Sequence, residues 1–157
     1  MAYEIIGETI KSAASIKLGQ IFDNPKRYKE NVTKPSYPSF WIVEVNLSVQ
    51  NTNIDNQSVL NKEINRIRLD YLMNIQYRVA ENTEGITNLQ QQLDAVGLQL
   101  MSSFNELELE LPVKVYNKSY EKVDGVGQFT FNVRVFAKPE IEQQQTMEDL
   151  SLSENIL

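Results

Sequence analysis

The sequence predicts an α+β fold in which a mostly antiparallel sheet is covered on one face by two helices. Three observations support this prediction. Apolar residues recur at helical spacing in two segments, they alternate with polar residues in several others, and an Asp-Gly pair separates the last two alternating segments. The chain has 157 residues, close to the size at which one hydrophobic core is usual, so we expect a single domain.

The first helix is expected over residues 3–22, where apolar side chains recur with roughly the 3.6-residue period of an α-helix. The Asp-Asn-Pro sequence at residues 23–25 ends it, because the residue before a proline avoids the helical region of φ and ψ. A polar, basic stretch follows at residues 26–34, and it is compatible with a short edge strand.

Two strands with alternating polarity are expected next. In residues 40–49 the apolar side chains from Trp41 to Val49 fall on one side and polar side chains on the other, which predicts a half-buried strand. Residues 67–79 repeat the same alternation and predict a second, longer strand. The polar segment 50–57 between them is expected to be a loop.

The second half of the chain predicts one helix followed by a hairpin. Apolar residues return to helical spacing over residues 86–104. Residues 107–115 predict a third strand interrupted by Pro112, which indicates an edge position or a bulge there. Asp124 and Gly125 then separate two further alternating segments, which is the strongest short-range signal for a β-hairpin turn.

The amino-acid composition excludes many kinds of active site. The chain contains no cysteine and no histidine, so disulfides, zinc-thiolate sites, cysteine nucleophiles and Ser-His-Asp triads are impossible. It also contains no apolar run of about 18 residues and no basic-then-apolar leader. The groups left for chemistry are carboxylates, lysine, tyrosine and serine, which can bind hard cations or act in glycosidase-type reactions, so an enzyme is less expected. We assign no catalytic residue and no metal ligand from composition alone. We expect no membrane contact, and we expect the protein to be made in a cytoplasm.

The net charge of −6 is unevenly distributed along the chain. Residues 139–157 contain five acids and no base, and thus account for all but one of the net negative charges. We expect a folded domain over residues 1–138 and a flexible acidic tail over residues 139–157, because the tail has too few apolar residues to order itself alone. A nearly neutral body without a basic cluster argues against specific binding of nucleic acid.

An acidic run is the first candidate functional feature. Glu106, Glu108 and Glu110 alternate with leucines and are expected on one face of the third strand. Such spacing is compatible with a divalent metal site or a pair of glycosidase carboxylates. A solvated or partner-facing acidic surface is the simpler interpretation, with Arg66 and Arg68 as basic partners within or between subunits.

Other candidates also have two interpretations. Ser119 and Lys122 match the Ser-x-x-Lys pattern of some acyl-transferring enzymes, but that pattern normally opens a helix and here it falls in a predicted hairpin. Trp41 is either an interface anchor or a core residue with its indole N–H bonded at the rim. Tyr28 lies among three bases and is expected in a solvated loop or a protein-contacting arm.

Three segments together resemble a known protein family. They are the helix followed by RYKENVTK and PSFWIVEV, the tyrosine-rich strand RLDYLMNIQYRV, and the hairpin YEKVDGVGQFTFNVRVFAK. This pattern resembles the tail terminator proteins of tailed phages and prophages of Gram-positive bacteria. The resemblance covers residues 3–138 and includes no catalytic signature.

The resemblance implies a structural virion protein of tail-terminator-like fold, without cofactor or enzymatic turnover. Such a protein forms a six-fold ring on the tail tube, stops tube polymerisation and joins the tube to a neck or head-completion protein. DNA passes through the lumen without specific binding. Glu106, Glu108 and Glu110 are then candidates for the lumen lining or for a subunit contact. A sheath-terminator, neck or head-completion role is the first alternative, and a carboxylate or Ser-Lys hydrolase is a distant one.

Overall fold

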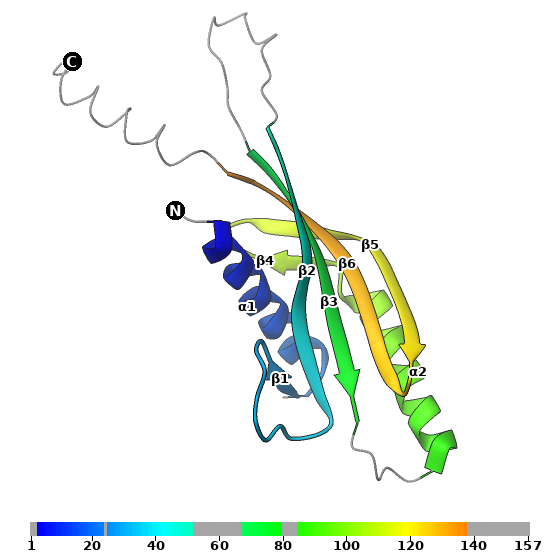
Figure 1. Cartoon of the computed structure of the whole chain (residues 1–157). Helices are drawn as coiled ribbons and strands as arrows, with labels where there is room; N and C mark the ends of the chain where they lie inside the picture. Colours follow the sequence, from blue (N-terminus) through cyan, green and yellow to red (C-terminus); the bar gives the residue numbers. More distant parts are fainter. Residues whose placement is uncertain (1–2, 24, 52–66, 80–84, 138–157) are drawn as a thin grey trace, which may run out of the picture. The chain divides into compact units, whose positions relative to one another are not determined.

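The computed structural model describes residues 3–23, 25–51, 67–79 and 85–137 (Figure 1). The helices and strands are, in chain order, α1 (Tyr3–Ile21), β1 (Lys26–Tyr28), β2 (Ser39–Asn51), β3 (Ile67–Arg78), α2 (Gly85–Ser103), β4 (Glu106–Glu108), β5 (Pro112–Val123) and β6 (Val126–Ala137). Two helices and a six-stranded, mostly antiparallel sheet confirm the predicted α+β class. The predicted tail over residues 139–157, and most of the predicted loop over residues 50–57, lie outside the described residues.

The strands lie in the order β1-β2-β3-β6-β5-β4. β1 pairs with β2 in parallel, whereas β5 pairs antiparallel with both β6 and β4. β1 is therefore an edge strand, as the basic stretch after the first helix predicted. The chain divides into two compact units, one containing residues 2–47 and 71–133 and the other containing residues 48–70 and 134–157 together with residue 1.

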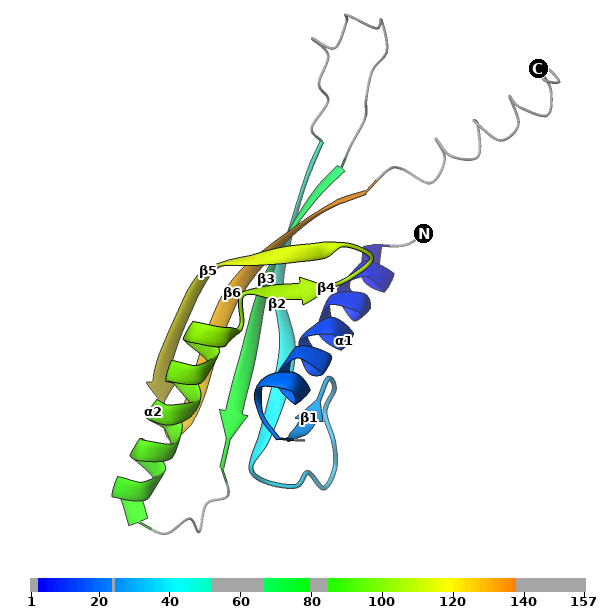
Figure 2. The same cartoon turned by 180° about the vertical axis from the view of Figure 1, so that it is seen from behind.

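The core of the larger unit lies between the sheet and the two helices, which cover the same face of the sheet (Figure 2). α1 contributes residues at helical spacing, and β3 and β6 contribute alternate residues, as their periodicities predicted. The fully buried Phe104, just after α2, packs against two rings of β6, Phe129 at 5.4 Å and Phe131 at 5.0 Å between ring centroids. These rings attach the end of α2 to the centre of the sheet.

Residues 107–115 were predicted to form one strand interrupted at Pro112, and they do not form one strand. The chain instead forms two strands, β4 and β5, which pair with each other so that Glu108 lies opposite Pro112. Between them the chain turns, and the backbone N–H of Leu109 donates to the carbonyl of Leu111 at 3.3 Å. Pro112 has no backbone N–H, so within an uninterrupted strand it would leave one hydrogen bond of the strand ladder unmade. The reversal just before it places Pro112 at the first position of β5 instead.

The predicted half-buried face of β2 is wrong beyond Trp41. Four consecutive residues at the start of β2, residues 39–42, are buried, and then Val43 and Val45 are 40% and 54% exposed. The start of the strand is covered on both faces, because Phe40 contacts Phe22 after α1 while Trp41 contacts Tyr28 of β1 on the other side. Alternating polarity identified the strand correctly, but it did not show that side chains pack against both faces of the strand only as far as Ile42.

The hairpin between β5 and β6 has a two-residue turn, with Val123 paired to Val126. Asp124 and Gly125 have φ angles of 52° and 75°, so both adopt the left-handed conformation that such a turn requires. Farther from the turn the register shifts between Tyr116 and Ser119, where Asn117 also has a positive φ of 55°. This irregularity is a β-bulge.

Tyr120 of β5 holds α2 close to the sheet. Its hydroxyl donates a hydrogen bond of 2.6 Å to the carbonyl of Leu93 on α2. Burial raises the pKa of Tyr120 to about 12, with the negative charge of Asp94 contributing, so the phenol keeps the proton that it donates. The ring lies directly against Gly97 of α2 and its hydroxyl against Gly127 of β6, which leaves no room for a side chain at either position.

Replacing Gly97 by alanine should destabilise the protein, although alanine is favoured over glycine by about 1 kcal/mol within a helix. The new methyl group would overlap the ring of Tyr120, and overpacking of this kind costs about 1–3 kcal/mol. Urea unfolding should therefore show a lower midpoint for Gly97→Ala. The control is Leu98→Ala, which changes a 74% exposed neighbour on the same helix and should alter stability by no more than about 0.5 kcal/mol. A Gly97→Ala protein as stable as the parent would contradict this packing.

Candidate interaction surface

Trp41 lies at the centre of a cluster contributed by three strands. The parallel register of β1 and β2 places Tyr28 beside Trp41, with ring centroids 4.8 Å apart. The guanidinium carbon of Arg78, from β3, lies 4.6 Å from the centroid of the Trp41 ring and forms a cation–π contact. The indole N–H donates to the hydroxyl of Ser39 at 2.9 Å. Trp41 is thus 7% exposed in the single chain, and its polar atom is satisfied.

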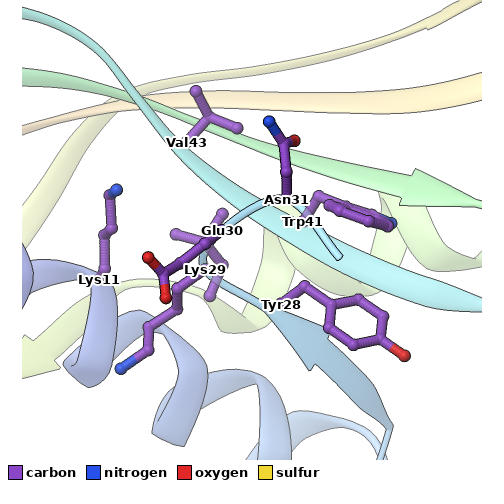
Figure 3. A pocket seen from close by; sticks show the side chains of 8 residues that line it. Lys11, Tyr28, Lys29, Glu30, Asn31, Trp41 and Val43 are labelled. Carbon is purple, nitrogen blue, oxygen red and sulfur yellow. The ribbon is translucent and has the colours of Figure 1, made fainter. Parts of the chain in front are cut away.

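A pocket of about 220 Å³ opens beside this cluster (Figure 3). Strand residues and two lysines line it, including Tyr28, Trp41, Ile42, Val43, Lys11 and Lys29. Lys11 comes from α1, and Lys29 follows β1 directly, where its ammonium group donates to the hydroxyl of Ser12 at 3.0 Å. The pocket therefore combines aromatic and aliphatic walls with the positive charges of two lysines and the negative charge of Glu30.

The pocket lies where the outer edge of β2 loses its neighbour. β1 pairs only with residues 39–41 of β2, and no other described strand lies on that side of β2. From Ile42 onwards this edge has no strand partner within the described part of the chain. Val43 and Val45 follow Trp41 on the same face of β2, and both are exposed. The sequence reasoning missed this feature, because it assigned these valines to a buried face.

Two of the three acidic residues share one strand face as predicted, and the third does not. Glu106 and Glu108 lie on β4 and are exposed, with the buried Leu107 between them. Glu110 is also exposed, but it lies after β4 in the turn that leads to β5. Within the described ranges no group of three acidic residues is placed to hold a metal ion.

Arg66 lies outside the described residues, and Arg68 has an acidic partner in its own chain. In the smaller unit, Asp70 accepts hydrogen bonds from Arg68 at 2.9 Å and from Arg134 at 2.7 Å. Burial alone would raise the pKa of Asp70, but the hydrogen bonds and charges of the two arginines outweigh it and hold this pKa below its ordinary value. Pairing of Arg68 with the acids near β4 stays a prediction.

Ser119 and Lys122 do not form a nucleophile and base. Both lie on β5, three positions apart, so their side chains point to opposite faces of the strand. The ammonium group of Lys122 is 2.7 Å from a carboxylate oxygen of Asp94 and donates to Gln90 at 2.8 Å, both on α2. This geometry lacks the helix start and the serine contact on which that chemistry depends.

Comparison with families of known proteins places this chain in a class of protein, the structural components of phage tails. The family described as phage tail terminator protein matches residues 9–146, which is most of the chain. The chain therefore belongs to the phage tail terminator family, and the resemblance predicted from the sequence is confirmed. No curated protein matches the chain. Among the described helices, none is long and apolar enough to cross a membrane.

Replacing Asp70 by asparagine should lower the free energy of unfolding by about 1–2 kcal/mol at pH 7, because two charge-assisted hydrogen bonds lose their acceptor charge. The folded protein lowers the pKa of Asp70, so its contribution is fully present above the unfolded value of about 3.9 and is lost as the pH falls through the folded pKa. Chemical unfolding at several pH values should show the difference between parent and variant shrinking on acidification below about pH 4. Glu108→Gln, which changes an exposed carboxylate, is the control and should have little effect at any pH.

Proposed function

We propose that this protein terminates the phage tail tube. Copies of the chain form a closed ring, a hexamer, on the last ring of the tube. The ring occupies the growing end, so that no further tube subunit adds, and its other side offers a surface to a neck or head-completion protein. The observation that carries this proposal is the match to the terminator family over residues 9–146.

Ring formation is supported by the two unlike edges of the sheet. Among the described strands, none pairs with the outer edge of β2 from Ile42 onwards, and β4 pairs only with residues 112–114 of β5. Beyond those residues, β5 has no strand on its outer side in the part of the chain that the structure describes. Two different open edges favour head-to-tail contacts between copies, and such contacts generate a ring when the rotation between copies closes.

The proposed partners are other copies of the chain, the tail tube protein and a neck or head-completion protein. DNA passes through the lumen without specific binding, which fits a chain whose residues 1–138 have almost no net charge. The exposed acids Glu106, Glu108 and Glu110 line the lumen or a subunit contact in this proposal. The ring takes its place at the head-proximal end of the tail during assembly in the host cytoplasm.

Two other functions make different predictions. A neck, sheath-terminator or head-completion protein would bind a different component of the particle. A hydrolase would need a catalytic pair, and the separation of Ser119 from Lys122 on opposite faces of β5 argues against the pair that the sequence offers. Tail-tube termination is therefore better supported than either alternative function.

Loss of the protein from an induced or infected cell should have two linked effects. Tubes should grow beyond their normal length because the end stays open, and DNA-filled heads should accumulate without tails because the joint is missing. Electron micrographs of lysates measure both effects. A head-completion protein would instead leave tails of normal length beside leaking heads, and a lytic enzyme would leave normal particles trapped in cells. Tails of normal length in the mutant would refute the proposal, and re-expression of the parent chain is the control.

Reversing two charges of the acidic run, Glu106→Lys with Glu108→Lys, should leave the chain folded but impair ring formation or DNA passage. Exposed carboxylates contribute less than about 1 kcal/mol to folding, whereas a reversed charge in an interface becomes repulsive. Circular dichroism tests the fold, and light scattering with infectivity tests assembly. Glu121→Lys, an exposed acid on β5, is the matched control. Full infectivity of the double variant would show that Glu106 and Glu108 belong to an ordinary solvated surface.

A further inference from the structure

We infer that the pocket beside Trp41 and the open edge of β2 receive residues 147–157 of a neighbouring copy of the chain. This inference rests on the proposed ring, in which copies lie side by side. It assigns a role to a segment outside the part of the chain that matches the terminator family, which ends at residue 146. The segment is acidic and contains apolar residues, whereas the receiving site contains lysines and exposed valines. The segment also has the alternating pattern of a strand, which suits the edge of β2.

The receiving site is cationic as well as apolar. The ammonium group of Lys29 contacts only the neutral hydroxyl of Ser12 among its described hydrogen-bond partners, so its charge is not neutralised there. Lys11 has a loose pair with the exposed Glu8 at 3.7 Å, one helical turn away. Glu30 also lines the pocket and offsets part of this charge. The surrounding segment 26–34 nevertheless contains four bases and one acid, so its net charge is +3.

The incoming segment has the opposite charge. Residues 147–157 contain three acids and no base. They also contain five large apolar residues, namely Met147, Leu150, Leu152, Ile156 and Leu157. Attraction between this segment and the lysines at the pocket orients it, while its leucines provide the apolar surface that Val43 and Val45 lack on their exposed face.

The backbone of the segment suits an edge strand. Leu150 and Leu152 alternate with Ser151 and Ser153, which is the two-residue period of a strand with one apolar and one polar face. The edge of β2 from Ile42 onwards presents backbone groups without a described strand partner, in line with the end of β1. An extended segment added there forms main-chain hydrogen bonds with β2, while its leucines contact the valines and the pocket wall.

Exchange between copies also satisfies the symmetry of a ring. Each copy donates one segment and receives one, so every interface in the ring is the same. Docking depends on a neighbour held nearby in the ring, where the effective concentration of the segment is high.

Disulfide trapping tests this exchange directly, because the parent chain contains no cysteine. The full-length double variant Val43→Cys with Leu152→Cys is assembled on tail tubes, oxidised and analysed on a non-reducing gel. The expected result is a ladder of linked chains up to the size of the complete ring. The control is Ile16→Cys with Leu152→Cys, which uses a 58% exposed position on α1 and should link at least about tenfold less. Val45→Cys in place of Val43→Cys provides a second receiving position, which should also link.

A charge swap separates docking from a general effect on folding. Lys11→Glu with Lys29→Glu in the trapping variant should reduce cross-linking about tenfold, because the pocket then repels the acidic segment. Adding Glu148→Lys with Asp149→Lys to the same chain should restore it. A merely structural role of the two lysines would not be rescued by changes in the segment.

The outcomes also distinguish this inference from the proposed function. If rings form and tubes have normal length but the trapping pair links no better than the control pair, the exchange is refuted and the terminator function stands. Internal disulfides within single chains, in place of a ladder, likewise refute exchange between copies. If no rings form and tubes lack a cap in the presence of the unmodified protein, the proposed function and the exchange both fail.

Discussion

The opposite orientation of two adjacent aromatic residues at the start of β2 is the constraint on which the rest of the larger unit depends. Phe40 faces the helices and packs between Phe22 and Tyr77, with ring centroids 4.9 Å from each. Trp41 faces the other side and packs between Tyr28 and Arg78. Because neighbouring strand residues point to opposite faces, one dipeptide contacts the end of α1 on one face and the Tyr28 side chain of the neighbouring strand β1 on the other. β1 ends opposite Trp41, so no described strand pairs with the outer edge of β2 beyond that residue.

Sequence periodicity predicted the helices and strands well, but it predicted poorly which faces of the strands are buried. Both helices, the alternation of β3 and the Asp-Gly hairpin follow from local patterns that the backbone geometry enforces. The division into β4 and β5 was missed, because alternating leucines looked like one strand and the turn before Pro112 lacks glycine. The burial of β2 was missed for a different reason, since exposure depends on which distant element covers a face.

The candidate interaction surface also depends on contacts between distant segments, which local sequence patterns do not show. Tyr28 and Trp41 were selected from the sequence one at a time, but their contact depends on a parallel register set across the intervening loop. Arg78 and Lys11 reach the same region from β3 and α1, and no spacing in the sequence relates them to Trp41. Val43 and Val45 could be selected only with the structure in hand, because their exposure shows an apolar strand face that is available to a partner.

In the proposed function the protein would end a polymer, and an open strand edge then creates a particular difficulty. A tube stops growing only if the capping ring offers no surface on which another ring of the same kind assembles. Head-to-tail contacts between unlike edges, however, continue into open filaments when the rotation between copies does not close a ring. Filling the edge of β2 with a segment from the next copy would occupy the surface that otherwise invites further strand addition. In this inference the lysines beside the pocket would add selectivity, since they attract an acidic segment and repel a basic one. Closure of the ring and protection of its edges would then be one event, and a ring that had closed would have no free strand edge at β2 on which to grow.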